Sequence, residues 1–287
     1  MQISIYGSRR QDGYISSIGS LLDALRDRGI SVFVHRNLAS LLNEEGYRLK
    51  LHGIGECSSL PEGTDFVMSI GGDGTFLRSA KWVGGKEIPI IGINTGHLGF
   101  LAENSIADAR DIVDDLLGGD FTPERRILLE AVCDDGTRID WPFALNEVAF
   151  LKAESASMIS VRIEVDGNFL ADYSADGIIM ATPTGSTAYN LSVGGPILVP
   201  TLHNIVLSPI APHTLTLRPI VVGADSILRA VVTSRKGDFR LSIDGRSVVL
   251  PCGVSITIRR APHSVITLRK KGENYASTLR NKFLWGS

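Results

Sequence analysis

The chain has 287 residues, a length at which a single hydrophobic core stops growing, so we expect two domains. Hydrophobic residues make up 44% and charged residues 21%, values of an average soluble globular protein that exclude a disordered or fibrous chain. The formal net charge of -2 gives no general attraction for phosphate backbones, which argues against nucleic acid as a partner.

The first residues and the cysteines bear on the cellular compartment. Residues 1–6 lack the basic region and apolar stretch of a signal peptide, and no apolar run reaches membrane-spanning length. We therefore expect a cytoplasmic protein with no membrane partner. The 3 cysteines, Cys57, Cys133 and Cys252, are widely spaced, which is typical of reduced structural thiols rather than of disulfides or a zinc site.

Up to about residue 123, short β-type runs alternate with amphipathic helical patterns. Strands are expected at 3–6, 30–34, 66–70 and 90–93, and helices around 14–25, 38–51, 76–83 and 109–117. The last of these helices follows a capping-box-like sequence at 105–108 and ends at Gly118-Gly119. Apolar strands covered by helices predict a parallel α/β sheet.

Beyond Pro123 the pattern changes to closely spaced, alternating strands. Turn signals at Asp135-Gly136, Asp166-Gly167 and Asp244-Gly245 are those favoured in tight hairpins, so the second domain is expected to be mainly β. The tail from Lys270 to Trp285 returns to a helical pattern and is expected to pack on the first domain. The predicted domains are 1–123 with 266–287, and 124–265, with a ligand cleft between them.

Gly71-Gly72-Asp73-Gly74-Thr75 directly follows the strand predicted at 66–70 and precedes a helical run. Glycines at the carboxyl end of a parallel strand let the backbone approach a phosphate, and amides at the next helix N-terminus point toward its charge. Asp73 repels phosphate, so we expect it to hold a magnesium ion indirectly or to accept a proton from an attacking hydroxyl. The alternative is a tight turn whose Asp caps the helix.

A second glycine-bearing turn, Asn-Thr-Gly-His-Leu-Gly-Phe at residues 94–100, follows the next strand. It is expected beside the first turn at the same edge of the sheet, so that both form one site. His97 is either a ligand-facing group or a turn histidine. Phe100 either stacks on a base or anchors the loop.

Asn146-Glu147 interrupts the apolar segment 143–150. A buried carboxylate and amide are costly unless something binds them, and vicinal ribose hydroxyls are suitable partners. The alternative is a pair at a sheet edge facing water.

Residues 176–196 combine a strand, a run of Thr, Ser and Gly, a Tyr-Asn pair and a double glycine. Small residues and hydroxyls around 184–187 can line a nucleotide site without crowding it. Tyr189 and Asn190 can address a base or an amide by stacking and hydrogen bonding. The alternative is a helix cap facing solvent.

These motifs occur in the order seen in bacterial NAD kinases: GGDGT, NTGHLGFL, NEV, DGIIMATPTGSTAY with NLSVGGP, and PHTLTLRP, over residues 71–219. GGDGT alone also resembles diacylglycerol and sphingosine kinases and, more remotely, phosphofructokinases. The resemblance implies an N-terminal Rossmann-like domain, a C-terminal β-rich, sandwich-like domain and a homotetramer or homodimer. It implies transfer of the terminal phosphoryl group of ATP, another triphosphate or polyphosphate to the 2′-hydroxyl of the adenosine ribose of NAD, with Mg²⁺ as the divalent cation.

Residue by residue, the resemblance makes Asp73 the catalytic acid-base group and assigns no residue directly to a metal. Gly71, Gly72, Gly74 and Thr75 would hold the phosphate donor. The implied NAD-binding residues are Asp73, Gly74, Arg78, His97, Phe100, Asn146, Glu147, Asp176, Thr187, Ala188, Tyr189, Asn190, Ser192 and Arg246. Ser174 departs from relatives that carry a basic residue there. Arg246 would substitute, unless it belongs to an exposed hairpin.

Two other functions share parts of this pattern. A lipid kinase would need an exposed apolar patch or a basic amphipathic helix, and neither is seen in the sequence. A non-catalytic NADP sensor would keep the pocket but tolerate loss of Asp73, so the presence of Asp73 favours the enzyme.

Overall fold

The computed structural model describes residues 1–9, 11–153 and 158–284, which form two compact units. The first unit comprises Met1–Arg125 and the segment that begins at Val265, and the second comprises Arg126–Ser264. The chain passes from one unit to the other within two long strands, β7 (Phe121–Cys133) and β18 (Ser255–Lys270).

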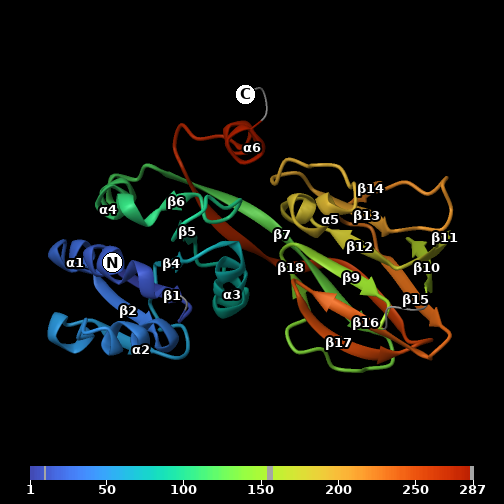
Figure 1. The fold of residues 1–287 in the computed structure, drawn as a ribbon, viewed down its shortest axis with the longest axis horizontal. Helices are drawn as coiled ribbons and strands as arrows, with labels where there is room; N and C mark the ends of the chain where they lie inside the picture. The colour runs from blue at the N-terminus through green and yellow to red at the C-terminus, as the bar shows by residue number, and fades with distance from the viewer. Residues whose placement is uncertain (10, 154–157, 285–287) are drawn as a thin grey trace. The chain divides into compact units, whose positions relative to one another are not determined.

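The first unit is built on a parallel sheet (Figure 1). Its strands, in spatial order, are β5 (Ile90–Asn94), β4 (Phe66–Ile70), β1 (Gln2–Gly7), β2 (Ser31–His35) and β3 (Gly55–Cys57). On the far side of β5, the end of β18 and the short β6 (Asn104–Ser105) also pair in parallel. The predicted parallel α/β sheet is therefore confirmed.

Helices cover both faces of this sheet. They are α1 (Ile15–Asp27), α2 (Arg36–Glu44), α3 (Asp73–Val83) and α4 (Ala109–Gly118). The unit also contains α6 (Tyr275–Phe283) and the short 3-10 turns η1 (Asp12–Tyr14), η2 (Leu49–His52), η3 (Gly84–Lys86) and η4 (Ile106–Asp108). Apolar faces of α1, α2 and α4 share one buried cluster with Ile3 and Ile5, and α1 packs beside α4 (Figure 1). Ser79 of α3 instead donates to Ser69 Oγ at 2.9 Å, and Ser69 points away from that cluster because strand side chains alternate.

Two predicted helix boundaries and one predicted helix cap in this unit were wrong. The helix expected around 38–51 ends at Glu44, because Gly46 adopts a φ of 92° and the chain resumes only as the short η2. The helix expected from residue 76 begins at Asp73. Ser105 accepts a hydrogen bond from the Ala107 amide at 3.2 Å and so caps η4, rather than closing a capping box on α4.

The second unit contains an antiparallel sheet of six strands: β14 (Ile220–Gly223), β13 (Asn204–Ile210), β12 (Gly177–Ala181), β9 (Glu147–Leu151), β16 (Asp238–Ile243) and β17 (Arg246–Pro251). Its second layer contains β11 (Asn168–Ala175), β10 (Ile159–Val165), β15 (Leu228–Ser234) and the first part of β18, while β7 pairs with β8 (Phe143–Ala144). Phe150 and Phe239 of one sheet share a buried cluster with Val161 and Ile258 of the other. This is the predicted sandwich-like, β-rich domain.

Two of the three predicted Asp-Gly turns form tight hairpins. Asp166-Gly167 joins β10 to β11 and Asp244-Gly245 joins β16 to β17, with positive φ at both residues of each pair, as a type I′ turn requires. Asp135-Gly136 does not, because β8 begins only at Phe143 and a longer loop intervenes. In the described part of the chain, no helix has the length and apolar character needed to cross a membrane.

Candidate active site

The glycine turn after β4 leaves the N-terminus of α3 open. Gly71, with a φ of 140°, donates its amide to Ile93 O at 2.8 Å, and a Cβ on it would lie 2.5 Å from Thr75 Oγ1. Gly72 is the N-cap residue, and no side chain caps the helix. A Cβ on Gly72 would have no neighbour within 4 Å, and on Gly74 only Arg78 Nη1 at 4.0 Å. Such a helix start can receive a phosphate.

Asp73 does not cap its own helix, which excludes the alternative interpretation of this turn. Its carboxylate reaches the second glycine turn, where Oδ2 accepts the Phe100 amide at 2.9 Å. Oδ1 accepts the amides of Leu101 at 2.9 Å and Ala102 at 3.0 Å. The two predicted turns therefore meet at one edge of the sheet, and three consecutive amides hold the Asp73 carboxylate.

Gly99 leaves the space that this carboxylate occupies. A Cβ at Gly99 would lie 2.0 Å from Asp73 Oδ1 and 3.1 Å from the Ala102 amide. We expect Gly99→Ala to displace Asp73, to lower kcat by about 10²-fold and to destabilise the fold by about 1–3 kcal/mol. Steady-state kinetics and urea unfolding of the variant would check this, and an unchanged kcat would contradict it.

The other predicted residues of the first unit surround these turns. His97 is exposed, while Phe100 packs against Phe283 with ring centroids 5.5 Å apart, which agrees with its role as a loop anchor. Arg78 is exposed and donates from Nη2 to Thr75 Oγ1 at 3.0 Å. Both Arg78 and His97 are thus accessible near the open end of α3.

In the second unit, Asp244 repeats the arrangement of Asp73. Its Oδ2 accepts the Leu145 amide at 2.7 Å, and its Oδ1 accepts the amides of Asn146 at 2.8 Å and Glu147 at 3.1 Å. Asp244 was predicted only as a hairpin residue. Its contact with the Asn-Glu pair is a feature of the candidate site that the sequence did not reveal, since the hairpin signal is local and the contact is not.

Glu147 is a buried carboxylate with an unsatisfied oxygen. The residue is 9% exposed, and its Oε2 accepts no hydrogen bond from any described residue. Burial, and secondarily the neighbouring charge of Asp244, raises the pKa of Glu147 to about 7, although the Tyr189 amide donates to it. Such an oxygen fits a hydroxyl donor from a ligand, and a water-facing sheet edge is excluded as the alternative.

The segment after β12 packs closely against this pair. Thr182 donates its amide to Asn146 O at 2.9 Å, and η5 (Thr184–Thr187) begins two residues later. A Cβ on Gly185 would lie 2.0 Å from Asn146 O, so only glycine permits this approach. Gly185 is a second feature whose role the sequence did not reveal.

The two side chains of the Tyr-Asn pair differ in exposure. Tyr189 is 39% exposed, and Ser192 is exposed while Thr187 and Ala188 are half-buried. Asn190 is fully buried, donates to Ser186 O at 3.0 Å and Pro196 O at 3.1 Å, and accepts from Ser208 Oγ at 2.6 Å. Contrary to expectation, the Asn190 side chain is therefore engaged within the protein, because α5 (Tyr189–Ser192) turns it inward.

Two charged residues of the second unit also have protein partners. Asp176 Oδ1 lies 2.7 Å from Lys152 Nζ. Arg246 donates to Trp141 O at 2.8 Å and Phe143 O at 2.9 Å, so its guanidinium holds the loop before β8. This favours the structural interpretation of Arg246 over its predicted substitution for the basic residue missing at Ser174.

Comparison with known proteins covers most of the chain. The family model of the ATP-NAD kinase N-terminal domain matches residues 21–121, and that of the C-terminal domain matches residues 145–269. NAD kinases of Porphyromonas gingivalis and Bacteroides fragilis are 44% and 41% identical, each over 100% of this chain and 98% and 99% of their own length.

Two solved structures share the fold. Yeast NADH kinase complexed with NADH aligns with a TM-score of 0.87 at 23% identity, covering 100% of this chain and 88% of that one. An Archaeoglobus fulgidus NAD kinase in complex with ATP aligns with a TM-score of 0.74 at 28% identity, covering 99% and 97%.

Proposed function

The chain belongs to the ATP-NAD kinase family, and from that premise we propose how its residues transfer the terminal phosphoryl group of ATP to the 2′-hydroxyl of the adenosine ribose of NAD. The observation that carries the proposal is the carboxylate of Asp73, held in place by three amides beside the open N-terminus of α3. A base and a phosphate-binding helix start are thus neighbours in one unit.

Asp73 Oδ2 is the atom that would receive the proton. A carboxylate offers about four acceptor positions, and the three amides use two on Oδ1 and one on Oδ2. The ribose hydroxyl would lose its proton to Oδ2 while its oxygen attacks the terminal phosphorus of ATP, and the bond to the bridging oxygen of ADP breaks. The products are NADP, ADP and one proton.

Glu147 and Asn146 would orient the ribose. The unsatisfied Oε2 of Glu147 is suited to accept from a hydroxyl, and Asn146, whose amide is held by Asp244, lies next to it in the chain. Exposed Tyr189 is suited to stack on a ring of the dinucleotide, with Thr187, Ala188 and Ser192 beside it. The ligand cleft between the two domains stays a prediction.

We treat the divalent cation as part of the nucleotide substrate, MgATP. Within the described ranges, no group of three His, Cys, Asp or Glu residues could hold a metal ion, so no protein ligand is assigned. Mg²⁺ ordinarily binds phosphate oxygens and keeps several waters, and it supplies charge neutralisation on the phosphates.

Gly72→Ala tests the donor site separately from the fold. Gly72 has φ -82° and ψ -175°, which alanine adopts readily, and its Cβ would enter open space. We expect stability to change by less than about 1 kcal/mol, while KM for ATP rises about 10-fold or more because the methyl group intrudes on the phosphates. Gly223→Ala, which also adds a Cβ in open space, is the control and should leave KM unchanged.

The test of the function is the formation of NADP from NAD, or of NADPH from NADH, by the purified protein with Mg²⁺ and with ATP, another triphosphate or polyphosphate as donor. Turnover with at least one pair supports the kinase. Measurable NAD or NADP binding without turnover for any donor would favour the sensor instead. A cytoplasmic location remains a proposal, and so does the homodimer or homotetramer that the resemblance implies. Light scattering of the purified protein tests the assembly.

A further inference from the structure

The C-terminal segment contacts the turn that holds Asp73. Glu103 directly follows the three residues whose amides bind the carboxylate, and Thr278 of α6 donates from Oγ1 to Glu103 Oε1 at 3.1 Å. Near the end of the same helix, Phe283 packs on Phe100, and Lys282 Nζ lies 5.7 Å from the centre of the Phe100 ring. The helix therefore meets the turn at two places.

Arg269 of β18 also binds Glu103. Its side chain is 7% exposed, with Nη2 donating to Glu103 Oε1 at 3.1 Å and Nε 3.3 Å from Glu124 Oε1. Glu103 itself is 12% exposed on its side chain. Separating one partner of a buried ion pair leaves an uncompensated charge, so this geometry is strongly maintained.

The turn is short and is held against β5 by hydrogen bonds and a close backbone contact. Asn94 Nδ2 donates to Asn104 O at 2.9 Å, and Asn104 Nδ2 donates to Gly92 O at 2.9 Å. The carbonyl of Leu101 approaches Gly92 so closely that a Cβ there would lie 2.0 Å from it. A displacement of Glu103 would consequently reach the amides of residues 100–102.

We propose that Glu103, held by Arg269 and Thr278, is a positioning residue for Asp73. Through it the C-terminal strand and helix set the place of the three amides and hence of the carboxylate. The inference rests on the proposed role of Asp73 in phosphoryl transfer. The coupling between α6 and the turn can nevertheless be measured without turnover.

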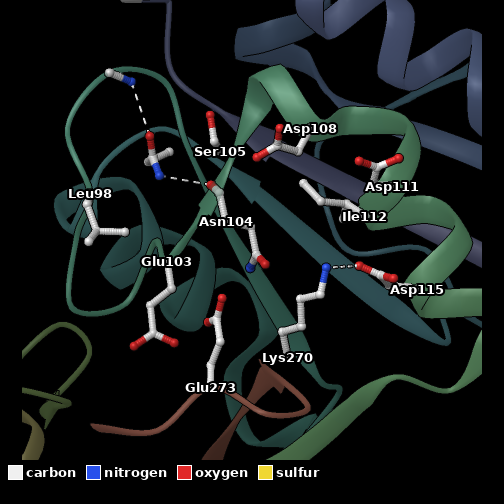
Figure 2. Close-up of a pocket in the computed structure, with 12 residues that line it drawn as sticks. Leu98, Glu103, Asn104, Ser105, Asp108, Asp111, Ile112, Asp115, Lys270 and Glu273 are labelled. Carbon is white, nitrogen blue, oxygen red and sulfur yellow. Dashed lines mark hydrogen bonds and ion pairs between the residues drawn. The ribbon is translucent and has the colours of Figure 1, made fainter. Parts of the chain in front are cut away.

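The chain offers a matched control in the next residue of the same strand. Lys270 Nζ pairs with Asp115 Oδ2 at 2.5 Å and so ties β18 to α4, on the side of an acid-lined pocket of about 500 Å³ (Figure 2). Figure 2 shows this pair on a different part of the pocket wall from Glu103. Lys270→Met should remove the ion pair between β18 and α4 and leave the contacts of Glu103 with Arg269 and Thr278 intact.

The experiment compares the full-length variants Glu103→Ala, Glu103→Gln, Thr278→Val and Lys270→Met. Hydrogen–deuterium exchange of the peptide covering residues 99–103 reports whether the amides on Asp73 open. Steady-state kinetics with NAD and MgATP separate kcat from KM. Chemical unfolding of each variant shows whether it is folded under assay conditions.

We expect Glu103→Ala to speed exchange in 99–103 and to lower kcat on the order of 10- to 100-fold, with both KM values within about 3-fold of the wild type. Glu103→Gln keeps an acceptor for Arg269 and Thr278 and should recover most of kcat. Thr278→Val, which removes one hydrogen bond, should lower kcat about 3- to 10-fold. Lys270→Met should change neither exchange in this peptide nor kcat.

Unchanged exchange and unchanged kcat in Thr278→Val and Glu103→Ala would overturn the inference while leaving the kinase intact. If Glu103→Ala does not fold, the exchange of residues 99–103 and the kcat of Thr278→Val alone test the inference. Faster exchange in a protein that has no NAD kinase turnover would uphold the coupling and overturn the proposed function. Equal effects from Lys270→Met would show that general anchoring of β18, rather than Glu103, is responsible, and would also overturn the inference.

Discussion

Replacing Asp73 by Asn should lower kcat by about 10²- to 10⁴-fold, the usual contribution of a general base, while NAD binding is largely retained. The substitution also has a structural effect. The amide group of asparagine can replace only one of the two carboxylate oxygens, so the Phe100 amide would face another donor. We therefore expect a loss of about 1–3 kcal/mol in the free energy of unfolding, measured by urea denaturation.

Asp244→Asn is the control for this structural effect. Asp244 holds three consecutive amides in the same way, but it is not proposed to receive a proton from substrate. The two variants should lose similar stability. Only Asp73→Asn should lower kcat by about 10²- to 10⁴-fold, whereas Asp244→Asn should act mainly on KM for NAD through Asn146 and Glu147. A comparable fall of kcat in both would refute the assignment of Asp73 as the base.

Replacing Glu147 by Gln should make the ligand-free protein more stable at pH 8 and weaken its binding of NAD. The folded-state pKa of Glu147 is raised to about 7 from 4.5. Between these values the folded protein keeps a proton that the unfolded chain has released, so rising pH destabilises the fold through this window. This shift of the Glu147 pKa corresponds to a contribution of about 3 kcal/mol to the free energy of unfolding. The contribution is fully present below pH 4.5 and is lost above pH 7.

Urea unfolding at pH 4.5 and pH 8 would measure this difference. At pH 4.5 the free energies of unfolding of the wild type and of Glu147→Gln should agree. At pH 8 the free energy of unfolding of the variant should be higher than that of the wild type by up to about 3 kcal/mol. NAD should then stabilise the wild type more than the variant at pH 8, because ribose hydroxyls donate to the carboxylate. If the free energy of unfolding depends on pH in the same way in the two proteins, the raised pKa of Glu147 is wrong.

The elements of the first unit could be predicted because buried parallel strands are apolar on both faces and stand out as short runs, as residues 66–70 do. Helix ends were less predictable. The apolar pattern around residues 38–51 indicates which side chains are buried, and both α2 and η2 bury apolar side chains. Because the pattern continues through both elements, it does not show that the helix breaks at Gly46.

The candidate site was predictable in its residue types but not in its contacts. The order of strand, glycine turn and helix predicts an open helix start at residues 71–75, and the structure has one. Neither motif indicates that Asp73 binds the amides of residues 100–102, because backbone amides carry no sequence signal. Asn190 shows the reverse error: a polar residue beside exposed Tyr189 was expected to face a ligand, yet adjacent helical residues point in different directions.

The discontinuity of the first unit has a consequence for how the chain is made. The unit that starts at Met1 is completed only by the segment beyond Val265, whereas Arg126–Ser264 is continuous. During synthesis the later unit can therefore finish folding while the earlier one still lacks the end of β18 and α6. The hydrogen bond from Arg269 to Glu103 can form only after the segment beyond Val265 has been made, so the turn that holds Asp73 is completed after the second unit has been synthesised.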